Sequence, residues 1–122
     1  KTDAAAAAAE KTLPEGRFAR LRLLEGVDRE FEPELQRLRT VTLEPRLTRI
    51  LKSRAEAARI VPLYLDLVED ARFLYDRDGF FRSVLDRLEV SMRRLGSERR
   101  VKGKVRYWVL KPDLKPGEVF EL

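Results

Sequence analysis

Carboxylates, hydroxyls and cations must carry any chemistry in this 122-residue chain, because its sequence contains neither cysteine nor histidine. This excludes a disulfide scaffold, thiolate or imidazole metal ligands, cysteine nucleophiles and histidine bases. Mg²⁺ remains a candidate cofactor, since it prefers oxygen ligands and takes few of them from protein. The carboxylates that could hold it are Asp3, Glu44, Asp66, Glu69, Asp70, Asp76 and Asp78.

Most of these carboxylates also fit structural roles. Asp66, Glu69 and Asp70 follow the spacing of a solvated helix face, while Asp76 and Asp78 suit turn and cap positions. Structural roles are therefore the main alternative to metal binding for these residues.

Positive charge is concentrated in one segment of a chain whose formal net charge is +5. Between Arg82 and Lys111, ten Lys and Arg residues stand against three carboxylates. Beside Tyr107 and Trp108, such cations could neutralise phosphates while an aromatic ring stacks on a base. The alternative is a solvated helix face followed by a hairpin whose aromatic residues belong to the core.

The length and the remaining composition indicate one globular domain in which 43% of the residues are hydrophobic. The glycine spacing matches neither a Walker-type loop nor a dinucleotide fingerprint. No apolar stretch is long enough to span a bilayer and no signal-peptide pattern opens the sequence, so we expect a cytoplasmic protein with no membrane partner.

Apolar residues at three- and four-residue spacing predict a core-facing amphipathic helix over residues 18–38. Pro33 should break this helix near Glu32, because proline removes a backbone donor and clashes with the preceding turn. The β-branched run 40–51, interrupted by Pro45, predicts a strand that carries Glu44.

The second half alternates helix and strand patterns. Ser53 is predicted to cap a short helix over 54–60, and Pro62 to open a helix from 63 to about 71. Residues 72–75 and the tail 101–122 favour short strands, the tail turning at Gly103, 111–113 and 115–117.

The strongest helix pattern follows a turn and cap at 76–79. The apolar residues of this helix are Phe81, Val84, Leu85, Leu88, Met92 and Leu95, and Gly96 is expected to end it.

Four segments carry a family resemblance. They are 61–71 (VPLYLDLVEDA), 74–81 (LYDRDGFF), 107–119 (YWVLKPDLKPGEV) and 13–17 (LPEGR). The first two resemble the C-terminal half of archaeal nucleotidyltransferases of the DNA polymerase β superfamily. The third resembles the closing motif of the same proteins, and the fourth the turn after their catalytic strand.

The resemblance implies an α/β (α+β) fold, a nucleotidyltransferase-like mixed sheet flanked by helices with a C-terminal helix and β-hairpin. We expect residues 1–122 to form a single compact unit. Within it, 1–61 would supply the rest of the sheet and its helices, and 62–122 the helical segment and the hairpin.

The resemblance also implies the transfer of a nucleoside monophosphate from an NTP to an acceptor hydroxyl, with Mg²⁺ positioning the triphosphate. The family signature, a Gly-Ser turn followed by an Asp-x-Asp pair, is absent from these motifs. By this resemblance Thr2-Asp3 would occupy the place of the acidic strand, so Asp3 is the candidate catalytic residue and metal ligand. Glu44 would supply a third acidic position if its strand lay beside that of Asp3.

The candidate phosphate-binding residues are Arg93, Arg94, Arg99, Arg100, Lys102 and Lys104. The rival hypothesis is a non-catalytic module that uses the segment from Arg82 to Lys111 to bind nucleic acid or another protein. A homodimer built on the apolar helices is a third alternative.

Overall fold

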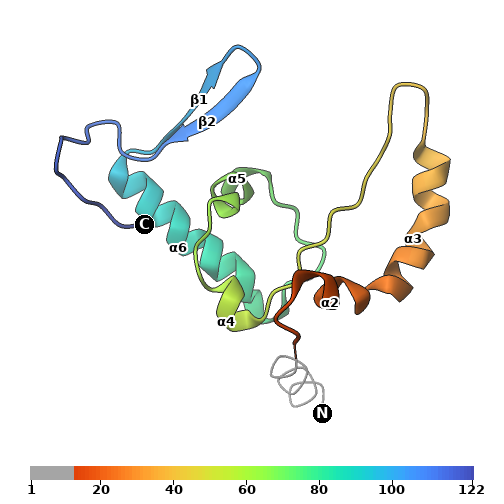
Figure 1. The fold of residues 1–122 in the computed structure, drawn as a ribbon. Coiled ribbons are helices and arrows are strands. Elements are labelled where there is room, and N and C mark those ends of the chain that lie inside the picture. Colours follow the sequence, from red (N-terminus) through yellow and green to blue (C-terminus); the bar gives the residue numbers. More distant parts are fainter. Residues whose placement is uncertain (1–12) are drawn as a thin grey trace. The chain divides into compact units, whose positions relative to one another are not determined.

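The computed structural model describes residues 13–122 (Figure 1). The chain divides into an amino-terminal unit, Lys1–Glu56, and a carboxyl-terminal unit, Ala57–Leu122. The regular elements among the described residues are helices and a small antiparallel sheet, which confirms the coarse α+β class. Asp3 lies outside the described residues.

The amino-terminal unit contains α2 (Arg17–Arg22) and α3 (Glu25–Leu38). The predicted break near Glu32 is wrong, since α3 continues through Pro33 and the helical stretch is interrupted at Leu23 and Leu24 instead. There the backbone N–H groups bond three residues back, to Arg20 and Leu21, at 3.1 and 3.0 Å, which tightens and ends the turn. Pro33 lies well inside α3 and withholds only one backbone donor.

The apolar face of these two helices does not form a core within the described part of this unit. Phe18 is 78% exposed, Val27, Phe31 and Leu38 are exposed, and no residue from 13 to 56 is buried. The helical spacing of the apolar residues therefore predicted α2 and α3 correctly. Their apolar side, however, does not face a core within residues 13–56.

Residues 40–51 form an irregular segment, so the predicted strand is wrong. The Thr40 Oγ1 accepts the Leu43 N–H at 3.0 Å, and the Thr40 N–H donates to the Leu43 carbonyl at 2.9 Å, which closes a local turn. Side chains of the β-branched type stabilise a strand only where a partner strand pairs with it, and no strand among residues 13–122 pairs with this segment. Glu44 is consequently on an exposed loop.

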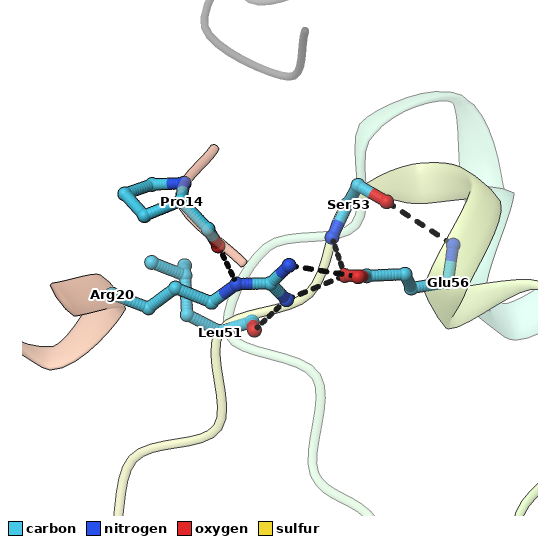
Figure 2. A network of polar contacts seen from close by, with 5 residues as sticks. All are labelled: Pro14, Arg20, Leu51, Ser53 and Glu56. Atoms are coloured by element: carbon cyan, nitrogen blue, oxygen red, sulfur yellow. Dashed lines mark hydrogen bonds and ion pairs between the residues drawn. The ribbon is translucent and has the colours of Figure 1, made fainter. Parts of the chain in front are cut away.

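A polar network ties the start of α4 (Arg54–Ala57) to α2 (Figure 2). The Arg20 guanidinium donates to both Glu56 carboxylate oxygens, at 2.6 and 2.8 Å, and also to the carbonyls of Leu51 and Pro14. Ser53 and Glu56 form a reciprocal capping box: the Ser53 N–H donates to Glu56 at 2.9 Å and the Glu56 N–H to Ser53 Oγ at 3.2 Å. The predicted cap at Ser53 is confirmed, although the helix ends at Ala57.

This network predicts an unusual titration. The hydrogen bond from Arg20, followed by that from the Ser53 N–H, lowers the pKa of Glu56 from an ordinary 4.5 to about 2. Because the folded pKa lies below the unfolded one, the stabilising contribution of Glu56 is complete above about pH 4.5 and is lost as the pH falls towards about 2. NMR titration of the Glu56 carboxyl carbon should show a midpoint of about 2.

In the same titration, Arg20→Gln should raise the midpoint of Glu56 towards 4.5. Arg22→Gln, a change on the same helix outside this network, should leave the midpoint in place. An unchanged midpoint in Arg20→Gln would contradict the assignment.

The carboxyl-terminal unit contains α5 (Leu63–Asp70), the 3₁₀ turn η1 (Arg77–Gly79) and α6 (Phe80–Leu95), which confirms both predicted helices. The carboxylate of Asp76 accepts the N–H groups of Phe81 and Arg82 at 2.9 and 2.8 Å, so it satisfies two orphan donors at the start of α6. At the other end Gly96 adopts φ 70°, a left-handed conformation that glycine tolerates without a steric penalty.

The core of this unit lies between α5 and α6. Tyr64 packs its ring edge against Phe81 at a centroid distance of 5.2 Å, and its hydroxyl donates to the Ala57 carbonyl at 2.9 Å. The buried residues are Tyr64, Leu65, Val84, Leu85, Leu88 and Met92.

The strands β1 (Glu98–Lys102) and β2 (Val105–Val109) form an antiparallel hairpin that turns at Gly103, where φ is 64°. It is the one sheet among the described residues, so the flanked mixed sheet is not seen there. Residues 72–75 and 118–120 are not strands, because no neighbouring strand pairs with either segment. The turns at 111–114 and 115–118 are confirmed by backbone bonds of 3.1 and 3.0 Å.

Candidate functional site

The hairpin Glu98–Val109 has two chemically different faces. Its register places Arg99 opposite Trp108 and Arg100 opposite Tyr107. Directly paired residues share a face of a sheet, and successive residues alternate between faces. Arg99 and Trp108 therefore lie on one face, which we call the inner face, and Arg100 and Tyr107 on the other.

The inner face is bound to α5 through Arg99. The two terminal nitrogens of its guanidinium donate to Glu69 and Asp70 at 2.9 Å each, and to Asp66 at 3.3 Å. The Trp108 indole N–H also donates to Asp66, at 2.8 Å, and the Arg99 guanidinium stands over the indole ring at 5.5 Å. Electrostatics, hydrogen bonding and a cation–π contact thus hold the hairpin against the helix.

This arrangement accounts for three of the carboxylates that were candidates for metal binding. Arg99 lowers the pKa of Asp70, chiefly through a hydrogen bond, and Asp70 in turn raises the pKa of Arg99. No group of three or more carboxylates that could hold a metal ion occurs among residues 13–122. Asp66, Glu69 and Asp70 have a structural role here, the alternative already open from the sequence.

The arginines predicted to bind phosphate have intramolecular partners. Arg93 pairs with Glu89 at 2.7 Å on α6, and Arg94 donates to the Glu121 carbonyl at 3.3 Å. Arg99 is engaged by α5, with 21% of its side chain exposed. These side chains must give up or share such contacts before they can bind phosphate.

Exposed cations also lie on the other side of the hairpin and at its tip, while Arg106 is exposed on the inner face. Lys102 and Lys104 are exposed and form no ion pair within residues 13–122. Arg100 is exposed and pairs with Glu98 at 2.8 Å, and Tyr107 across from it is 41% exposed. The pKa of Arg100 is raised, chiefly by its hydrogen bond with Glu98 and to a smaller extent by Tyr107. We call Arg100, Lys102, Lys104 and Tyr107 the outer hairpin surface.

The turns after the hairpin are organised by Lys111, which the sequence placed in a turn but without its carboxylate partners. Its ammonium lies 3.0 Å from both Asp113 and Glu118, and only 16% of its side chain is exposed. The pKa of Lys111 is raised, most by its hydrogen bond with Asp113 and next by its hydrogen bond with Glu118. The signal available in the sequence was a lysine flanked by turn residues and followed by two carboxylates.

The remaining catalytic candidates are not brought together in the described structure. Glu44 pairs with Arg46 at 3.6 Å on the exposed loop of the amino-terminal unit, and its pairing with Asp3 falls outside the described residues. Asp76 is used as the cap of α6.

Comparison with protein-family models, curated proteins and solved structures finds no match for this chain. Within residues 13–122, no helix is long and apolar enough to cross a membrane.

Proposed function

We propose that this chain is a nucleotidyltransferase-like protein that transfers a nucleoside monophosphate from an NTP to an acceptor hydroxyl. In this proposal the outer hairpin surface contacts phosphates of the nucleotide or the acceptor. The observation that carries the proposal is that two of the segments resembling the family, 61–71 and 107–119, are in contact: Trp108 of the closing segment donates to Asp66 of the helical segment at 2.8 Å.

The reaction would form a bond from the acceptor oxygen to the α-phosphorus and break the bond from that phosphorus to the β-phosphate oxygen. Pyrophosphate leaves, and the proton of the acceptor hydroxyl passes to solvent. Mg²⁺ would supply charge neutralisation on the triphosphate, with Asp3 as its candidate ligand. The cations of the outer hairpin surface would bind and orient phosphates.

The test is an assay of the intact protein with Mg²⁺ and each of the four NTPs, with release of pyrophosphate as the readout. We expect release with at least one NTP, loss of release on chelation, and loss in Asp3→Asn. Asp78→Asn, which removes a carboxylate from the turn before α6, is the matched control and should retain activity. If no NTP binds and none yields pyrophosphate, the transferase proposal is wrong.

A second candidate function is a non-catalytic module that binds a polyanion. It is favoured by the absence of a metal-binding group of carboxylates among residues 13–122, together with two lysines that have no ion-pair partner there. Salt and chelation distinguish the two functions. A phosphate-driven binder loses affinity steeply with salt and ignores EDTA, whereas a metal-bridged nucleotide site fails on chelation.

A further inference from the structure

We infer that the outer hairpin surface holds a single-stranded nucleic acid, with one base stacked on Tyr107 and the phosphate backbone beside Arg100, Lys102 and Lys104. The inference deepens the proposed function, on whose phosphate-contacting hairpin it rests, by naming the class of acceptor.

The aromatic and cationic residues of this surface are on the same side of the hairpin. Tyr107 is directly opposite Arg100 in the register, and Lys102 follows Arg100 on the same face of β1. Alternate residues of a strand are about 7 Å apart, so the cations form a row beside the ring. A row of cations beside an exposed aromatic ring suits a chain of phosphates with a base between them.

The outer side differs from the inner side in its accessible aromatic ring, because Arg106 is an exposed cation on the inner face as well. On the inner face, Trp108 donates to Asp66 and its ring is covered by Arg99, which is itself bound to three carboxylates. The indole was an equal candidate for stacking in the sequence, but its contacts with α5 assign it to packing. Tyr107 is the ring of the hairpin that remains open, at 41% exposure.

The open shape of the hairpin favours an extended ligand. A two-stranded hairpin presents an open ribbon, whereas sites for small molecules such as mononucleotides are usually concave. A duplex keeps its bases stacked inside, where Tyr107 cannot reach a base face, while a single strand exposes them. The preference therefore should run from single strand to duplex to mononucleotide.

The experiment measures binding of a fluorescently labelled single-stranded oligonucleotide of about 12 nucleotides to the intact chain by anisotropy, over a range of salt concentrations. Tyr107→Ala should weaken binding about tenfold, and Tyr107→Phe should bind like the wild type because the π-face is kept. Tyr75→Ala, at a tyrosine that is 83% exposed on a loop, is the matched control and should not change affinity.

The double variant Lys102→Gln/Lys104→Gln should reduce the slope of log affinity against log salt by about 1.4, as expected for two phosphate contacts on a single strand. Lys115→Gln, in a turn outside the hairpin, should leave the slope unchanged. Thermal unfolding of each variant checks that the fold is retained.

The outcomes separate this inference from the proposed function. Oligonucleotide binding that Tyr107→Ala weakens, without pyrophosphate release, supports the inference and removes the transferase proposal. NTP binding and turnover without oligonucleotide binding overturn the inference alone. Affinity for duplex equal to that for single strand, or insensitivity to Tyr107→Ala, also overturns it.

Discussion

Replacing Leu88 with alanine is expected to lower the free energy of unfolding of the carboxyl-terminal unit by about 2–5 kcal/mol. Leu88 is 1% exposed and lies midway along α6, in the core between α5 and α6. The substitution removes buried methyl groups and leaves a cavity that the two helices can fill only in part.

The measurement is denaturant unfolding of the intact chain, followed by fluorescence of Trp108, the single tryptophan. Its indole contacts α5, so its emission should report whether the hairpin stays bound to that helix. Val90→Ala is the matched control, because Val90 is on the same helix but 66% exposed; it should change stability by no more than about 0.5 kcal/mol. Equal losses in the two variants would show that α6 does not bury the face described.

Replacing Asp76 with alanine is expected to destabilise the same unit by about 0.5–2 kcal/mol. Its carboxylate accepts two backbone N–H groups, from Phe81 and Arg82, at the start of α6. Without it, those donors lose their partner, and the favourable contact of a negative charge with the helix N-terminus is lost as well.

The control for Asp76 is Asp78→Asn. Asp78 has φ 55°, and asparagine tolerates this left-handed conformation, so the variant removes a nearby carboxylate with little backbone strain. We expect it to be close to wild type in chemical unfolding. The loss in Asp76→Ala should also be the same with Mg²⁺ and with EDTA. A loss seen only with Mg²⁺ would mean that Asp76 binds metal rather than capping the helix.

The α5–α6 core and the Asp76 cap matter for function because they position the surface on which the hairpin is anchored. Arg99 contacts α5 through side chains about thirty residues earlier in the chain, so the hairpin can be held only where α5 is formed. The inner face then becomes structural, and the outer hairpin surface is left as the exposed cationic and aromatic side.

Local signals were sufficient for the helices and turns of the carboxyl-terminal unit. Proline before α5, the Asp76 cap, the apolar spacing of α6 and Gly96 at its end all act within a few residues, as does the hairpin turn at Gly103. The same is true of the Ser53 cap on α4. Each of these depends on backbone hydrogen bonding or dihedral preference, which neighbouring residues determine.

Only the tertiary structure decided which charged and aromatic groups remain available. The sequence placed ten cations between Arg82 and Lys111, but it could not show that Arg99 is bound by Asp66, Glu69 and Asp70. It also could not separate Trp108 from Tyr107, which differ because alternate residues of a strand face opposite sides. The strand predicted over 40–51 failed for the same physical reason: a strand, like an ion pair, requires a partner that is distant in the chain.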